Sequence, residues 1–132
     1  YLQRLAASNP NIIFIGFVND VGNWIEVFHM FVFPSLEEGL GSTLLDVMQH
    51  SKAIVASAVG GILDVVQDEH SGVVAAAGDA HMLATAIERM YLDTALREKC
   101  VAGGLEQLER YSPPRIAGCY HSLYQSVLNS AV

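Results

Sequence analysis

The stretch FVFPSLEEGLGSTLLDVMQH, residues 31–50, places acids and glycines directly after an apolar run. The run ends at Pro34, Glu38 precedes the glycines, and Gly39 and Gly41 flank a single leucine. Glycine adopts positive φ readily, so it lets the backbone turn tightly and approach a ligand closely. We therefore expect residues 38–41 to form a turn that can bind a ligand at the end of a strand.

The residues after this turn favour an anion beside groups that accept hydrogen bonds. Ser42 and Thr43 begin a predicted helix, and the free N–H groups and dipole of a helix start favour phosphate. Asp46 follows in the second turn, and carboxylates accept hydrogen bonds from hydroxyl groups. Two carboxylates, Glu38 and Asp46, around a phosphate site fit a nucleotide-sugar, which has hydroxyls on both sides of a diphosphate. The alternative is a solvated turn whose acids complement the helix dipole.

Composition narrows the class of protein. The chain has 132 residues, 52% of them hydrophobic and 16% charged, which predicts one folded domain with a real core. The net charge of −7 argues against nucleic acid and anionic membranes as partners, because both need a basic surface. No apolar run approaches the ~20 residues of a membrane helix, so we expect no membrane insertion.

Cysteine and histidine usage predicts neither a disulfide nor a metal site. Cys100 and Cys119 lie in helix-like segments without metal-ligand spacing, which favours free thiols in a reducing, cytoplasmic location. The histidines form no HxxxH pair, so we expect no bound metal.

Apolar runs alternate with helix-like segments along the chain. Four runs have the length and composition of buried strands, at residues 11–16, 30–33, 53–57 and 71–77. The predicted helices cover residues 1–8, 20–29, 42–50, 62–67, 78–91, 93–110 and 112–128. The helices at residues 78–91 and 112–128 each carry an apolar stripe that is expected to face the core. The first stripe comprises Met82, Ala86, Ile87 and Met90, and the second Ile116, Tyr120, Leu123, Tyr124, Val127 and Leu128.

This alternation predicts an α/β fold, a Rossmann-like doubly wound parallel sheet covered on both faces. Ligands of such sheets bind beyond the carboxyl ends of the strands. The turn at residues 38–41 and the pair Gly60 and Gly61 both fall at that edge.

An ordered series of motifs resembles a known family. IIFIGFV, VFPSLEEGLGSTLLDVM, AIVASAVGGILDVV, SGVVAAAGD and a late YSPP are similar to the C-terminal, nucleotide-sugar-binding half of retaining GT-B-fold glycosyltransferases. These are the glycosyl transferases group 1, which include glycogen synthases and mannosyltransferases. The resemblance implies that residues 1–132 are a single truncated donor-binding domain. It would lack its first two strands and the N-terminal, acceptor-binding domain, which becomes an expected partner.

The resemblance also implies roles for single residues. Glu38 matches the first acid of the family motif and would contact hydroxyls of the donor sugar at the catalytic centre. Asp46 matches the second acid and would hold the ribose. The implied donor-binding set is Glu38, Gly39, Leu40, Gly41, Ser42, Thr43, Asp46, Gly16, Phe17, Gly60 and Gly61. Within it, Leu40 and Gly41 would hold the sugar, Ser42 and Thr43 the phosphates, Gly16 and Phe17 the base, and Gly60 and Gly61 the adjacent wall. The nucleotide-sugar is a substrate, so no cofactor is expected.

The sequence departs from the family pattern at several positions. Only Arg4 and Lys52 precede Arg89, and neither matches the Arg and Lys that grip the diphosphate in the family. Asp46 is shorter than the usual Glu, and Ser51 stands where the family has a glycine that ends the helix in a left-handed conformation. We therefore expect the isolated chain to be inactive, and to self-associate as a homo-oligomer because the absent strands leave apolar edges.

Two other functions remain open from the sequence. The first is a non-catalytic, stand-alone fragment that acts as a binding or assembly module. The second is an unrelated flavodoxin-like or NAD-type domain that shares only the architecture.

Overall fold

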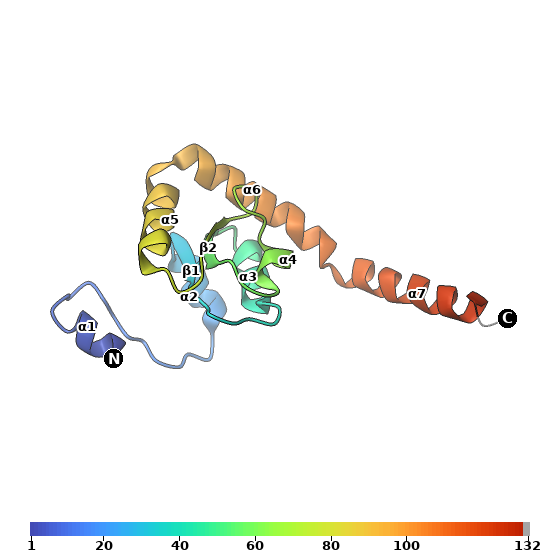
Figure 1. Cartoon of the computed structure of the whole chain (residues 1–132), viewed down its shortest axis with the longest axis horizontal. Helices are drawn as coiled ribbons and strands as arrows, with labels where there is room; N and C mark the ends of the chain where they lie inside the picture. Colours follow the sequence, from blue (N-terminus) through green and yellow to red (C-terminus); the bar gives the residue numbers. More distant parts are fainter. Residues whose placement is uncertain (131–132) are drawn as a thin grey trace.

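A parallel sheet forms the centre of the molecule (Figure 1). The computed structural model describes residues 1–130. Its strands are β1 (Met30–Phe33), β2 (Ala53–Ser57) and β3 (Val73–Ala75), in the order β1-β2-β3. Both pairings are parallel, with Phe31 opposite Ile54 and Val55 opposite Val73. The predicted α/β class with a parallel sheet is confirmed.

The helices are α1 (Leu2–Ala6), α2 (Val21–Val27), α3 (Ser42–Gln49), α4 (Ile62–Val65), α5 (Ala80–Leu92), α6 (Thr94–Arg110) and α7 (Pro113–Ser130). Helices α3 and α4 pack on one face of the sheet, and α5 and α6 on the other. Side chains of a strand alternate between the faces, so Ile54 and Ala56 of β2 join one core with α3 and α4. Ala53 and Val55 join a second core with α5 and α6. Every residue of β2 is buried, as expected for the middle strand of a covered parallel sheet.

The prediction of a strand at residues 11–16 is wrong. These residues form no strand, and their side chains are exposed, with Ile13 78% and the following Phe17 91% accessible. A strand needs a neighbour to receive its backbone N–H and C=O groups. Within residues 1–130 the sheet contains β1, β2 and β3, and residues 11–16 pair with neither of its open edges, at β1 or at β3. The segment and α1 lie apart from the body (Figure 1).

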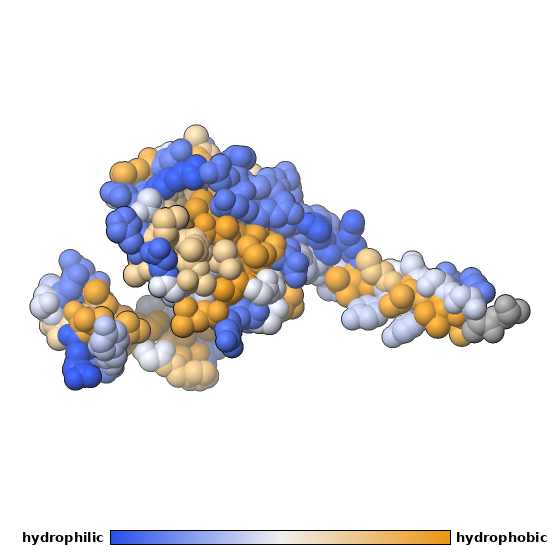
Figure 2. Space-filling model, in the orientation of Figure 1, coloured by the Kyte–Doolittle hydropathy of each residue, from blue (hydrophilic) through white to orange (hydrophobic). Residues whose placement is uncertain are grey.

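The prediction that the apolar stripe of the last helix faces the core is also wrong. All of α7 is exposed, and the helix projects away from the sheet (Figure 1). Its apolar residues run along the projecting helix as a hydrophobic band (Figure 2). Helical periodicity indicates that a face can pack, but it does not identify what the face packs against.

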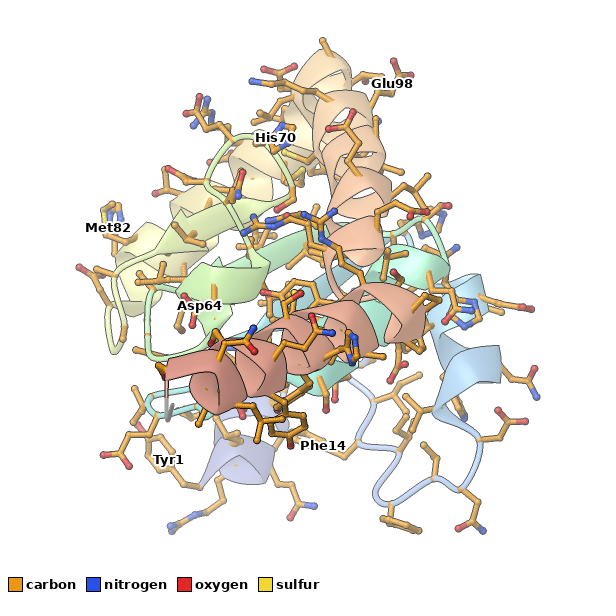
Figure 3. The ribbon with its side chains drawn as sticks, turned by 90° about the vertical axis from the view of Figure 1, so that its right-hand side faces the viewer. Tyr1, Phe14, Asp64, His70, Met82 and Glu98 are labelled. Atoms are coloured by element: carbon orange, nitrogen blue, oxygen red, sulfur yellow. The ribbon has the colours of Figure 1, made fainter. Side chains whose placement is uncertain are left out.

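The stripe on α5 is partly correct. Ala86 and Met90 are buried, and Ile87 packs against the second core. Met82 is 50% exposed and lies at the outer side of the molecule (Figure 3).

Glycines in α6 permit close packing of this helix against the loop before β3. A Cβ at Gly103 would lie 2.0 Å from the carbonyl oxygen of His70, so only glycine fits between α6 and the loop before β3. The helix continues to Arg110, and α7 begins at Pro113. Tyr111 and Ser112 alone separate these two long helices.

Among residues 1–130, no helix is both long and apolar enough to cross a membrane.

Candidate functional site

The turn between β1 and α3 is closed by its own acid. Glu38 is partly buried, and its Oε1 accepts hydrogen bonds from the N–H of Gly39 at 3.1 Å and of Gly41 at 3.3 Å. Gly41 has φ 69° and ψ 44°, a left-handed conformation that favours glycine. The positive φ expected at both glycines is found at Gly41 but not at Gly39. Within residues 1–130, the other carboxylate oxygen of Glu38 accepts no hydrogen bond from the protein.

The start of α3 presents free donors. Gly41 is the N-cap and provides no side chain to cap the helix. The N–H of Leu44 donates to the carbonyl oxygen of Gly41 at 2.8 Å. Within residues 1–130, the N–H groups of Ser42 and Thr43 donate to no protein acceptor. These two N–H groups and the helix dipole together favour an anion at this position.

Gly60 and Gly61 press directly against the turn. The N–H of Gly61 donates to the carbonyl oxygen of Glu38 at 3.2 Å. An added Cβ would lie 2.1 Å from that same oxygen at Gly60, and 2.0 Å from the carbonyl oxygen of Gly39 at Gly61. The structure therefore brings the two loops, which follow β1 and β2, into backbone contact at the carboxyl edge of the sheet.

The remaining predicted residues are more dispersed. Asp46 lies on the exposed side of α3 and makes no recorded side-chain hydrogen bond within the described chain, whereas Leu44 and Val47 are fully buried. Leu40 is 48% exposed beside the turn. Gly16 and Phe17 are not packed against the turn: a Cβ at Gly16 would meet no atom within 4 Å, and Phe17 is 91% exposed.

No lysine or arginine side chain of the described residues forms a hydrogen bond with the turn. The recorded hydrogen bonds of Lys52, Arg89, Arg97 and Arg110 go to other parts of the chain. Within residues 1–130, none reaches residues 38–46. The start of α3 therefore supplies the positive end of a helix dipole at the turn.

The perturbed titratable groups also lie elsewhere. The hydrogen bond and charge of Arg89 lower the pKa of Glu69, and the same bond raises the pKa of Arg89. Burial raises the pKa of the Cys100 thiol, which packs against the second core. Among residues 1–130, no cluster of three or more His, Cys, Asp or Glu side chains is placed to hold a metal ion.

A cavity at the strand ends was missed by the sequence reasoning. It has a volume of about 170 Å³ and is lined by residues that include Pro34, Leu36, Ser57 and Ala76. Pro34 and Ala76 directly follow β1 and β3, and Ser57 ends β2. The positions just past each strand were the signal available, since ligands of parallel sheets bind there. A larger hollow of about 450 Å³, bordered by His29, Lys52 and Ala53, lies at the opposite, amino-terminal edge.

Comparison with known proteins identifies relatives along most of the chain. The glycosyl transferases group 1 family matches residues 1–93. The mannosyltransferase LpcC of lipopolysaccharide core biosynthesis from Rhizobium leguminosarum bv. viciae is 32% identical over 93% of this chain and 35% of its own length. The capsular polysaccharide biosynthesis glycosyltransferase CapM from Staphylococcus aureus is 27% identical over 93% of this chain and 33% of its length. The chain thus spans about a third of these relatives.

Solved structures share the fold over a similar range. Sucrose-phosphate synthase from Thermosynechococcus elongatus matches 98% of this chain and 33% of its own, with a TM-score of 0.82 and 25% identity. Anabaena HepE, solved in complex with UDP-glucose, matches 95% of this chain and 35% of its own, with a TM-score of 0.80 and 21% identity, which shows the fold alone. The family match and these neighbours agree with the motif series at residues 11–90. The chain belongs to the glycosyl transferases group 1 and has the fold of a C-terminal domain of GT-B glycosyltransferases.

Proposed function

We propose that this chain is the donor-binding part of a retaining glycosyltransferase, which transfers a sugar from a nucleotide diphosphate-sugar to an acceptor. The observation that carries this is the pair of free N–H groups of Ser42 and Thr43 at the start of α3, beside the carboxylate of Glu38. The N–H groups suit phosphate oxygens, and the free oxygen of Glu38 suits a sugar hydroxyl. Both groups lie at the sheet edge where ligands bind.

The proposed roles follow the geometry around that turn. Oε1 of Glu38 holds the turn closed, while its other oxygen accepts a hydrogen bond from the donor sugar. The backbone at residues 39–41 lies under the sugar, and Gly60 and Gly61 form the wall behind it. Asp46, exposed on α3, holds the ribose hydroxyls. Gly16 and Phe17 approach the base only when residues 11–17 move toward the turn.

In the proposed transfer reaction, negative charge develops on the leaving diphosphate. Transfer with retention passes through an oxocarbenium-like transition state, as in glycosidases. Donors fixed in advance at the developing negative charge stabilise such a transition state strongly. Ser42 and Thr43 supply the donors in this chain. Within the described part of the chain, no Arg or Lys side chain hydrogen-bonds the turn, so we propose that the isolated chain binds the donor without efficient transfer and without a cofactor.

Titration of the 132-residue chain with UDP-glucose, GDP-mannose and ADP-glucose, followed by NMR, tests the donor site. Binding of at least one should shift the amide resonances of Ser42 and Thr43. Glu38→Gln keeps the carbonyl acceptor that closes the turn but removes the charge, so it should weaken binding, as should Asp46→Ala. Glu37→Gln removes the neighbouring exposed charge and is the matched control. If no nucleotide-sugar binds at millimolar concentration, the donor site is wrong.

A second candidate is a non-catalytic binding module, and it is favoured because no lysine or arginine side chain within residues 1–130 hydrogen-bonds the turn. Slow release of nucleoside diphosphate from the bound nucleotide-sugar separates the two functions, because an inefficient donor-binding part retains some transfer and a non-catalytic module has none. Binding with no release at all, even when a polysaccharide acceptor is added, supports the non-catalytic module. Tighter binding of NAD or FMN than of any nucleotide-sugar would contradict both candidates.

A further inference from the structure

Helix α4 links the Gly60–Gly61 wall to the rest of the molecule. It has only four residues, Ile62–Val65, and starts directly after Gly61. Ile62 and Val65 are fully buried, and the Cγ1 of Ile62 lies 3.6 Å from the position that a Cβ of Gly41 would occupy. A helix of one turn is not stable on its own. Its position must therefore be set by the groups that pack against it and bind its ends.

Two side chains from α6 and its end bind the carbonyl groups at the end of α4. The hydroxyl of Tyr111 donates to the carbonyl oxygen of Asp64 at 2.7 Å, and Asp64 is marked on α4 in Figure 3. The Nε2 of Gln107 donates to the carbonyl oxygen of Val65 at 3.3 Å. The last carbonyls of a helix have no partner within the helix, so these two donors satisfy groups that α4 leaves open.

The Gln107 contact is a buried one. Only 3% of Gln107 is exposed, and its Oε1 accepts a hydrogen bond from Arg110 at 3.0 Å. A buried amide with both ends bonded has little freedom to reorient. Tyr111 packs with its ring against the first core. Both side chains are thus held firmly by α6, and they transmit the position of α6 to α4.

We infer that Tyr111 and Gln107 are positioning residues for the turn at residues 38–43. They fix the end of α4, and α4 fixes Gly61, whose N–H binds the carbonyl oxygen of Glu38 at 3.2 Å. Because Gly60 and Gly61 leave no space against that turn, a shift of α4 must move the backbone that carries Glu38. This inference rests on the donor site proposed above, since it assigns the turn as the part that needs to be positioned.

Tyr111→Phe tests the inference with the least change, because it keeps the ring and removes only the donor. The amide resonances of Gly39, Gly41 and Gly61 in the ligand-free 132-residue chain are the first measurement, and nucleotide-sugar affinity is the second. We expect the three resonances to shift and affinity to fall about 2- to 10-fold, the range for one lost hydrogen bond. Tyr91→Phe, at a side chain 72% exposed, is the control and should change neither.

The outcomes separate three interpretations. Unchanged Gly39, Gly41 and Gly61 resonances in Tyr111→Phe would overturn the inference. Equal shifts throughout β2 would overturn it as well, because they indicate a general loss of stability. Local shifts in a chain that binds no nucleotide-sugar would support the positioning and reject the proposed donor site. If Tyr111→Phe does not fold, Gln107→Met, which keeps the shape of the side chain, is judged by the same resonances.

Discussion

Ser51, which follows the C-cap of α3, adopts φ 55°, in the left-handed region where a Cβ is unfavourable. The side chain is exposed, and its replacement removes no recorded hydrogen bond of the hydroxyl. We expect Ser51→Gly to raise the free energy of unfolding by about 1 kcal/mol, measured by urea denaturation. The control is Gln49→Gly, within α3, which should lower it by about 1 kcal/mol. Lower stability of Ser51→Gly would contradict the strain at this position.

Gly61 has no room for a side chain against the turn. We expect Gly61→Ala to lower the free energy of unfolding by about 1–3 kcal/mol, the usual cost of overpacking, and to weaken nucleotide-sugar binding. Gly118→Ala is the matched control, since a Cβ there meets no atom within 4 Å. That change should stabilise α7 by up to about 1 kcal/mol. Equal stability of Gly61→Ala and the wild type would show that the two loops are not in contact.

Glu69 and Arg89 form the ion pair with the shortest recorded separation, 2.6 Å between Oε1 and Nη1. The hydrogen bond from Arg89, and then its charge, lower the pKa of Glu69 below its ordinary 4.5. A carboxyl with a lowered folded-state pKa contributes stability above its unfolded pKa and loses it as the pH falls through the folded value.

We therefore expect wild type to be slightly more stable than Glu69→Gln at pH 7, and the difference to shrink as the pH falls below 4.5. The difference should be small and decrease with salt, because both side chains are 47% exposed. Thermal unfolding of both proteins from neutral to acid pH measures it, with Glu88→Gln as control. A difference that grows toward acid pH would contradict this assignment.

Among the elements, the segment at residues 11–17 departs most from the structure that its sequence predicts. Its side chains are those of a buried strand, yet Gly16 takes φ 66° and no ladder pairs the segment. We expect the amides of residues 12–16 to exchange with deuterium at rates near those of an unfolded chain, whereas those of Ile54 and Val55 are protected. Strong protection at residues 12–16 would show that the segment pairs with a strand in solution.

The elements that the sequence predicts well are those whose partners are close in the chain. β2 and α3 are adjacent, and the apolar patterns of Leu44, Val47 and Ile54 correctly indicate one core. Residues 11–16 and α7 carry equally clear patterns, but a pattern specifies a face and not its partner. Those two predictions of buried elements were therefore wrong.

The site follows the same rule. The turn, the start of α3 and the Gly60–Gly61 wall could be predicted, because parallel strands bring their carboxyl ends to one edge. The engagement of Glu38 with its own turn depends on side-chain rotamers, which spacing does not report. The contact of Tyr111 with Asp64 joins residues 47 positions apart through a single hydroxyl, and no local pattern indicates it.

For the whole molecule, exposed apolar surface is the dominant feature. The band on α7 includes Tyr120, Leu123 and Tyr124, all more than half exposed. We expect the chain to self-associate, with a mass above that of one chain in light scattering. Tyr124→Ser with Leu128→Ser should reduce the mass, whereas Gln125→Ser and Ser122→Asn, on the polar side, should not. A monomer at high concentration would contradict this expectation.

A small rotation at the junction between α6 and α7 produces a large displacement at the far end of α7. Eighteen residues of α7 extend about 27 Å at the usual helical rise, so a rotation of about 10° at the junction moves the far end by about 5 Å. The same junction contains Tyr111, whose hydroxyl holds α4. The distance between a spin label on Ser130 and one on α5 would therefore change by several times more than the displacement near Asp64 that causes it.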